Sequence, residues 1–181
     1  MLQIRDFTGS SHRLTQLQPG DKERMRIVYR ADTRPPSTIF SVGFKPRFKG
    51  GIQIQDGGQM IGGISTSKEI TIAMKYASLY GGYVYALYTD DKSVDVVDEL
   101  YKKGKHAALP NAYTQMEIAC NSIPPNQIVM ARKVTCDDDK KMTWEGVFET
   151  NPKREQKQDS DPMYITANYL FNLDMPFKAP E

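Results

Sequence analysis

Short apolar runs separated by glycine and proline turns form the dominant pattern along the chain. The run at 25–32 is partly β-branched and predicts a strand. This strand ends before Pro35 and Pro36, because proline cannot donate to a sheet ladder. Further strands are predicted over 64–67, 83–89, 115–120, 127–135 and 144–150.

Two helices are predicted from proline and glycine positions and from apolar spacing. The first lies within 35–44, where Pro35 stands at the start and Gly43 just past the end. The second runs from about 68 to 80, and Thr66 or Ser67 is placed to cap it. One face of the second helix is apolar, with Ile70, Ala73, Met74 and Ala77 at helical spacing.

The segments between these elements carry weaker signals. Residues 45–63 contain three glycine pairs and predict a long loop with a short strand near 52–54. Residues 93–100 are compatible with either a strand or a helix. Residues 102–113 predict a loop that contains Gly104 and Pro110.

The two ends of the chain differ from its centre. Residues 1–24 are mixed and polar and predict an N-terminal extension, which leaves 25–181 as a single domain. Residues 151–162 have a disordered composition, whereas 164–177 carry enough apolar groups to pack on the domain. The charged run 137–141 predicts a solvated hairpin turn.

Charge and hydropathy narrow the possible functions. Lys and Arg total 24 against 22 Asp and Glu, so a net charge of +2 does not indicate a polyanion partner. No run approaches the roughly 20 apolar residues that span a bilayer. Residues 1–20 lack a signal-peptide core. Either the protein does not use the general secretory route or the chain begins after a cleaved signal.

The two cysteines, Cys120 and Cys136, allow at most one internal disulfide. Neither belongs to a Cys-x-x-Cys pair or lies near a histidine in sequence, so no zinc site is predicted. The first interpretation is two free thiols with at least one in a strand. A disulfide is the alternative if the protein is exported.

Three polar islands follow one another along this framework. Arg30 lies near the end of the first predicted strand, and its planar, charged guanidinium group suits a carboxylate or phosphate. Ser65, Thr66 and Ser67 precede the second helix. Gln115 and Glu117 are two residues apart on a predicted strand, so their side chains are expected on one face, able to bind one ligand.

The segments 29–36, 64–67 and 115–117 together resemble the Arg-Ser-Glu class of mono-ADP-ribosyltransferases, most closely the catalytic subunits of cholera and pertussis toxins. The islands lie about 35 and 50 residues apart, in the order of that family. The resemblance implies an α+β fold with two small, mostly antiparallel sheets and flanking helices. It also implies an NAD cleft between the sheets and a catalytic domain over 25–181.

The resemblance implies a role for each island. NAD is the co-substrate, and its ribose passes through an oxocarbenium-like state when the bond to nicotinamide breaks. Glu117 would hold the ribose 2′-hydroxyl and stabilise the cationic sugar. Arg30 would grip a phosphate or the adenosine-side ribose. Ser65 would orient the Glu117 carboxylate by a hydrogen bond.

Further NAD contacts are implied at Ala31, Thr66 and Tyr76. Thr66 and Ser67 are also expected to shape the turn before the helix. Tyr76 lies on that helix, where its ring could stack on nicotinamide. The alternative for Tyr76 is an ordinary half-buried tyrosine. Residues 31–64 contain no histidine, unlike the toxins, so an activating histidine there is absent or moved.

Gln115 occupies the family position that faces the acceptor. Glutamine cannot act as a base at neutral pH, so the arginine specificity of cholera-type relatives is not implied. Relatives with glutamine here modify asparagine or guanine, among other acceptors. The segment 104–114 corresponds to the acceptor-recognition loop of the family, and Tyr113 and His106 are its candidate substrate contacts.

Three functions follow from these patterns. The first is a mono-ADP-ribosyltransferase with possible NAD glycohydrolase activity, a bacterial toxin or effector that modifies a host protein side chain after secretion or injection. The second is modification of guanine in DNA, against which the near-neutral charge weighs. The third is an NAD-binding or interaction module without turnover. No metal is expected in any of them.

Overall fold

The computed structural model describes residues 26–155 and 160–181. The predicted extension over 1–24 lies outside the described residues. The strands are β1 (Ile27–Asp32), β2 (Gln53–Ile54), β3 (Met60–Ile61), β4 (Ile64–Ser67), β5 (Tyr83–Tyr88), β6 (Val94–Asp95), β7 (Glu117–Cys120), β8 (Ile128–Cys136), β9 (Lys141–Thr150) and β10 (Phe177–Lys178). The helices are α2 (Pro36–Val42), α3 (Ile70–Tyr80), α4 (Val96–Lys102), η2 (His106–Ala108), α5 (Leu109–Gln115), η3 (Pro125–Gln127) and α6 (Pro162–Phe171).

Antiparallel pairing links eight of the strands in the order β10-β9-β8-β5-β1-β4-β7-β6. β1 and β5 pair along their whole length, whereas β1 and β4 pair only where Tyr29 lies opposite Ser67. Beyond that pair the two strands separate, so the sheet opens between a five-stranded and a three-stranded half. The α+β class and the antiparallel sheets are confirmed, and the two halves join at this one residue pair.

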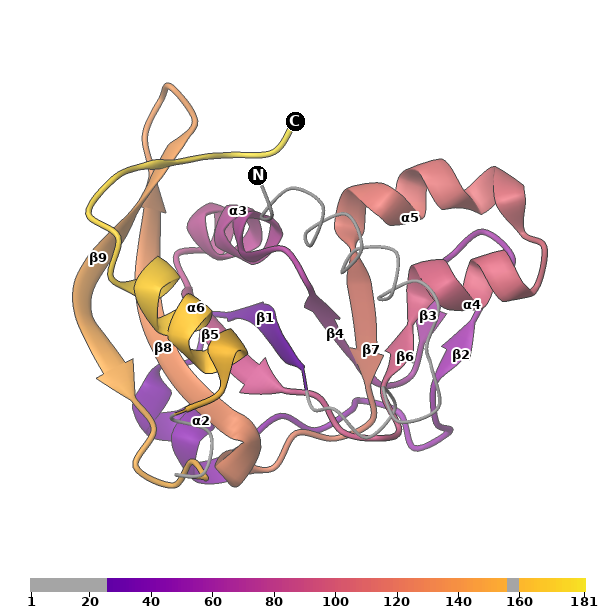
Figure 1. Ribbon diagram of the computed structural model, residues 1–181, viewed down its shortest axis with the longest axis horizontal. Helices are drawn as coiled ribbons and strands as arrows, with labels where there is room; N and C mark the ends of the chain where they lie inside the picture. Colours follow the sequence, from indigo (N-terminus) through magenta and orange to yellow (C-terminus); the bar gives the residue numbers. More distant parts are fainter. Residues whose placement is uncertain (1–25, 156–159) are drawn as a thin grey trace.

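Apolar side chains fill both faces of the central strands. On one face, α3 buries Ile70, Ala73, Met74 and Ala77 against β1, β5 and β8. On the other face, Ile39 and Phe44 pack with Tyr85. Figure 1 shows α3 above β1, next to the gap between β1 and β4. The buried strands therefore form a rigid base on which that gap is held open.

The prediction of a loop over 102–113 is wrong. Helix α4 extends to Lys102, and η2 and α5 follow after Gly104. Pro110 lies in the first turn of α5, where proline is tolerated because that N–H would have no helical partner. A third apolar cluster buries Val96, Val97, Leu100 and Ala112 between the two helices. Tertiary packing thus stabilises α5, which the sequence alone did not indicate, and α4, which it left open between a strand and a helix.

The glycine-rich segment is more ordered than predicted. Besides the strand expected near 52–54, it forms a second strand, β3, which pairs with β2 as a short hairpin. Gly58 in its turn has a φ of 88°, a conformation that glycine adopts without strain. The ambiguous stretch 93–100 divides into the short strand β6 and the first part of α4.

The start of α3 differs from the predicted capping. The helix begins at Ile70, and the Oγ of Ser67 accepts a hydrogen bond from the N–H of Glu69, the residue just before the helix, at 3.1 Å. Thr66 caps nothing, because its buried hydroxyl donates to the carbonyl of Ile118 at 2.8 Å. Thr66 thus joins β4 to β7, and Ser67 joins the chain before α3 to Gln115.

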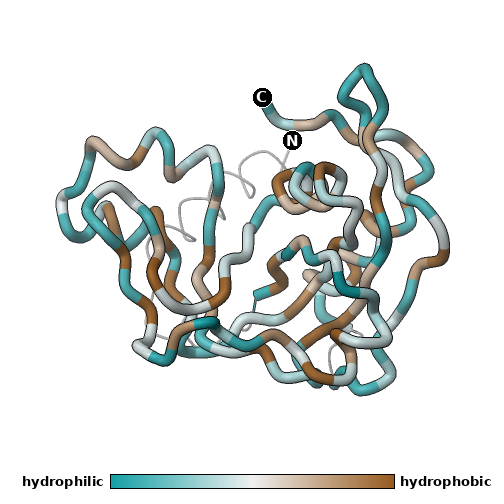
Figure 2. The backbone as a smooth tube through the Cα atoms, turned by 180° about the vertical axis from the view of Figure 1, so that it is seen from behind, coloured by the Kyte–Doolittle hydropathy of each residue, from teal (hydrophilic) through white to brown (hydrophobic). Residues whose placement is uncertain are grey.

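The C-terminal segment packs on the five-stranded half, as predicted. Phe171 of α6 is buried, and its ring stacks on Trp144 at 4.8 Å between centroids. Figure 2 shows apolar stretches along the strands and a hydrophilic tip on the β8–β9 hairpin, where 137–141 form the predicted turn. Cys120 and Cys136 are both free thiols in strands, so the disulfide alternative is wrong. Among the described helices, none is long and apolar enough to cross a membrane.

Candidate active site

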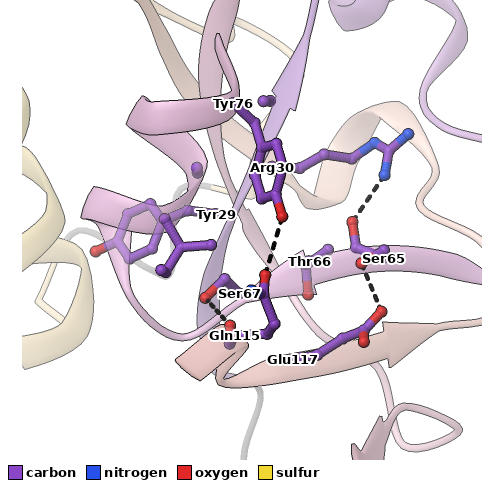
Figure 3. A pocket seen from close by; sticks show the side chains of 11 residues that line it. Tyr29, Arg30, Ser65, Thr66, Ser67, Tyr76, Gln115 and Glu117 are labelled. Atoms are coloured by element: carbon purple, nitrogen blue, oxygen red, sulfur yellow. Dashed lines mark hydrogen bonds between the residues drawn. The ribbon is translucent and has the colours of Figure 1, made fainter. Parts of the chain in front are cut away.

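Glu117 is the first residue of β7 and projects into the opening between the sheet halves. The hydroxyl of Ser65, on the neighbouring strand β4, donates to its Oε1 at 2.6 Å. Figure 3 shows the two side chains meeting at the floor of a pocket. In the described part of the chain, Oε2 of Glu117 accepts no hydrogen bond, so it can receive one from a ligand.

Burial raises the pKa of the Glu117 carboxyl above its usual range, and the hydrogen bond from Ser65 opposes that rise. The hydroxyl therefore does two things to Glu117. It fixes the direction of the carboxylate, and it stabilises the charged form that a cationic transition state would require.

Arg30 lies on the opposite side of the opening, on β1. Its Nη1 donates to the carbonyl oxygen of Ser65 at 2.7 Å, so Ser65 contacts both Arg30 and Glu117. The Nε of Arg30 is buried and has no hydrogen-bond partner among the described residues. A buried unpaired donor is costly, and an anionic or hydroxyl-bearing ligand would satisfy it. Burial lowers the pKa of Arg30, which still leaves a guanidinium charged at neutral pH.

The guanidinium of Arg30 packs on the ring of Phe44, a residue that the sequence analysis missed. The guanidinium carbon lies 5.2 Å from the centre of the Phe44 ring, within cation–π range. The ring is buried, and the backbone of Phe44 exchanges two hydrogen bonds with Ile123 at 2.8 and 3.0 Å. No sequence signal identifies this contact, because α2 and a non-local bridge create it.

The prediction that Gln115 and Glu117 share one strand is wrong. Gln115 is the last residue of α5, Met116 adopts a left-handed conformation with φ 46°, and β7 begins only at Glu117. Ser67 holds this bend, because its hydroxyl donates to the carbonyl of Gln115 at 2.7 Å. Gln115 and Glu117 nevertheless line the same cavity. A tight reversal, and not strand periodicity, brings them together.

Tyr76 reaches across from α3 to Gln115. Its hydroxyl donates to Oε1 of Gln115 at 3.1 Å, and Nε2 of Gln115 lies 3.4 Å from the hydroxyl of Thr114. The amide is thus oriented with its oxygen toward Tyr76 and its NH₂ away from it (Figure 3). The sequence analysis placed Tyr76 at the site and did not foresee this bond.

Two adjoining cavities occupy the opening. One has a volume of about 380 Å³ and contains Glu117, Gln115 and Thr66; the other has a volume of about 750 Å³. Both are lined by Arg30, Ala31, Ser65 and Tyr76. Arg34, Lys45 and Arg47 also line the larger cavity. Asp32 lines it too and pairs with Arg34 at 2.8 Å, but cations remain in excess and suit phosphate groups.

The candidate acceptor contacts Tyr113 and His106 do not line the two cavities of this opening. Tyr113 is exposed on α5, and His106 packs its ring edge-on against Tyr101 at 5.8 Å. Neither residue lines the cavities that contain Glu117. The predicted NAD contacts Arg30, Ala31, Ser65, Thr66, Tyr76 and Glu117 do come together around one cavity.

No protein-family model matches the sequence, and no curated protein matches it either. Solved structures do resemble the fold. EcPltA superposes with a TM-score of 0.55 at 19% identity, over 76% of this chain and 90% of that chain. A variant of Scabin, a toxin from Streptomyces scabies, gives 0.50 at 20% identity, over 72% and 76%.

Full-length CARDS toxin superposes with a TM-score of 0.54 at 18% identity, over 74% of this chain. The chain spans only 30% of the length of that toxin. A protein described as a guanine-specific ADP-ribosyltransferase gives 0.51 at 19% identity, over 73% of this chain and 79% of that chain. The chain therefore shares its fold with these toxins and with that ADP-ribosyltransferase, which is the fold that the sequence resemblance implies.

Proposed function

We propose that the protein is a mono-ADP-ribosyltransferase that cleaves NAD and transfers ADP-ribose to a protein side chain in a host cell. One observation carries this proposal: Ser65 joins Arg30 and Glu117 across the opening of the sheet, by contacts of 2.7 and 2.6 Å. Such an arrangement offers a cation for a phosphate or ribose and an oriented carboxylate for a developing positive charge. The fold shared with a protein described as a guanine-specific ADP-ribosyltransferase supports the same activity.

The cavities suggest how NAD would bind. The nicotinamide ribose would enter the smaller cavity beside Glu117, with the nicotinamide ring near Tyr76. The diphosphate and adenosine would follow into the larger, cationic cavity past Arg30 and Ala31. The free Oε2 of Glu117 would accept the ribose 2′-hydroxyl, and this bond would strengthen as the sugar becomes cationic.

The chemistry of the step follows from that placement. The bond between nicotinamide and the ribose C1″ breaks, and its electron pair leaves with nicotinamide. The Glu117 carboxylate stabilises the resulting oxocarbenium-like sugar. A nucleophile then bonds to C1″ and loses a proton to water. Water itself as nucleophile would give NAD glycohydrolase activity.

A bacterial toxin or effector that is secreted or injected into a host cell is the biological role we propose. The fold neighbours CARDS toxin and Scabin support it. Guanine in DNA is the second candidate acceptor, since one neighbour is described as guanine-specific and Gln115 provides no base. The net charge of +2 favours the protein acceptor.

Transfer of label tests the proposed activity. The purified protein is incubated with NAD labelled in the adenylate and with a nuclease-treated host-cell lysate. We expect protease-sensitive label, and its loss with Glu117→Gln. The control Glu149→Gln changes an exposed carboxylate on β9 and should label as the parent does. Label that survives protease and disappears with nuclease in an untreated lysate would reject the protein acceptor.

A further inference from the structure

Residues 95–116 form an arm beside the opening of the sheet. The arm contains α4, η2 and α5, and it joins β6 to β7, the strand that begins with Glu117. Figure 1 shows α4 and α5 on one side of the opening and α3 on the other. Gln115, near the end of the arm, lines the cavity assigned to the nicotinamide ribose. The position of the arm therefore decides where Gln115 lies relative to Glu117.

Two consecutive residues, Ser67 and Lys68, hold both ends of this arm. At its end, the hydroxyl of Ser67 donates to the carbonyl oxygen of Gln115 at 2.7 Å. The backbone N–H of Lys68 donates to the carbonyl oxygen of Met116 at 2.9 Å. At its start, Nζ of Lys68 pairs with Oδ2 of Asp95 at 2.7 Å. The chain that leads from β4 to α3 thus holds the two ends of the arm together.

The contacts of Asp95 connect this ion pair to the helices of the arm. Oδ1 of Asp95 accepts a hydrogen bond from the N–H of Asp98 at 3.2 Å and so caps α4. In the sheet, Asp95 lies opposite Ile118 of β7. α4 packs on α5 through the buried side chains of Leu100 and Ala112. A displacement of Asp95 would therefore move α5 as well.

The ion pair is shielded from solvent. The side chains of Lys68 and Asp95 are 18% and 11% exposed. Every other ion pair between described residues has a side chain that is at least 40% exposed. Exposed pairs contribute little, whereas loss of one partner from a shielded pair leaves an uncompensated charge. Asp98 is paired with Lys102 at 2.7 Å, so Lys68 is the cation that compensates Asp95.

We infer that Lys68 is a positioning residue for transfer, because its ion pair with Asp95 holds the arm and keeps Gln115 in place beside Glu117. The inference rests on the proposed transferase activity. In the described part of the chain, the Glu117 carboxylate and its partner Ser65 make no hydrogen bond to either member of the pair. Loss of the pair should therefore spare NAD cleavage more than transfer.

The balance between transfer and hydrolysis should depend on the arm. After nicotinamide leaves, either the nucleophile of the acceptor or water bonds to C1″ of the ribose. The acceptor reacts only when it is held in register with C1″, and a small misplacement lowers that rate strongly. Water needs no such placement. Displacement of Gln115 should thus direct ADP-ribose from the acceptor to water.

The test measures both products of NAD cleavage. The protein is incubated with adenylate-labelled NAD and a host-cell lysate, and label on macromolecules is divided by nicotinamide released to give a transfer fraction. Lys68→Met removes one charge of the pair. Asp95→Asn removes the other and keeps an oxygen that can cap α4. Lys102→Met is the matched control, because it breaks the more exposed pair with Asp98 on the same helix.

We expect the transfer fraction to fall about tenfold in Lys68→Met and in Asp95→Asn. Nicotinamide release in the absence of lysate should stay within about threefold of the parent. Lys68→Arg keeps the charge and should recover most of the transfer. Lys102→Met should match the parent in both assays.

The double variant Lys68→Met/Asp95→Asn separates positioning from stability. Each single variant leaves one shielded charge without its partner, so its Tm should fall. The double variant removes both charges and should regain part of that Tm. Its transfer fraction should nevertheless stay low, because no ion pair then holds the arm.

Three results would overturn the inference. These are a transfer fraction at the parent level in both single variants, an equal loss of release and transfer, and a double variant that regains transfer together with its Tm. A parent that releases no nicotinamide or transfers no label would instead reject the proposed function, so the two failures are distinguishable.

Discussion

The hydroxyl of Ser65 donates to the Glu117 carboxylate at 2.6 Å, and this bond counteracts the effect of burial on the glutamate. Ser65→Ala removes it. We expect nicotinamide release to fall about 5- to 30-fold, which corresponds to a bond of about 1–2 kcal/mol. The control Ser78→Ala removes a hydroxyl of α3 that bonds only its own helix, and it should keep parent activity.

The same variant should change the pH profile. The charged form of Glu117 is the active one, so activity falls as the pH drops through its raised pKa. Without Ser65 that pKa should rise further, because the hydrogen bond lowers it. The acid limb of kcat/KM should therefore move to higher pH in Ser65→Ala. An unchanged acid limb would contradict the role given to this bond.

Glu117→Gln should stabilise the fold at neutral pH. A glutamate whose pKa is raised on folding adds stability only while protonated, below its ordinary value of 4.5, and loses that contribution as the pH rises through the folded pKa. The amide of the Glu117→Gln variant does not ionise, so the variant loses no stability at this position as the pH rises. Thermal unfolding should give a higher Tm for the variant at pH 7, with a smaller difference in acid. A lower Tm at pH 7 would argue against a destabilising carboxylate.

Phe44→Leu tests the cation–π contact between Phe44 and Arg30. Loss of a cation–π contact of about 1 kcal/mol should raise the KM for NAD by about fivefold, with a smaller change in kcat. Phe40→Leu is a matched control, since Phe40 packs in the same apolar cluster. Equal KM values for the two variants would show that the effect comes from the core and not from Arg30.

Tyr76→Phe separates the hydroxyl of Tyr76 from its ring. The variant keeps a ring for stacking on nicotinamide and loses the bond to Gln115. Nicotinamide release should stay near the parent level, whereas transfer to protein should fall by about 3- to 10-fold. Tyr76→Ala should lower both. If Tyr76→Phe lowers release and transfer equally, the hydroxyl does not act through Gln115.

The sequence alone was sufficient to predict those parts of the site that depend on residues close together in the chain. Arg30 lies in the second half of an apolar strand, and Ser65 lies in a short β-prone run before an amphipathic helix, so both could be placed from the chain itself. The α+β class was implied by the family resemblance that these segments carry, and the many glycine and proline turns indicated short strands. These features depend on neighbours in sequence, where propensity and periodicity are informative.

Other parts depend on contacts distant in sequence and could not be foreseen. Helix α5 is short and is held by Leu100 and Ile54, so its segment was predicted as a loop. Gln115 ends that helix, and the left-handed Met116 reverses the chain so that Gln115 and Glu117 line the same cavity. The β2–β3 hairpin is likewise held by packing of Ile54 and Gly58 on α4.

Nicotinamide release tests the central claim most directly. Parent protein, Glu117→Gln and the control Glu149→Gln are compared at saturating NAD, with NAD binding measured separately by calorimetry. We expect release to fall at least about a hundredfold in Glu117→Gln, because it loses the charge that stabilises the cationic sugar. NAD binding should remain, and Glu149→Gln should match the parent. Release by Glu117→Gln at the parent rate would contradict the account.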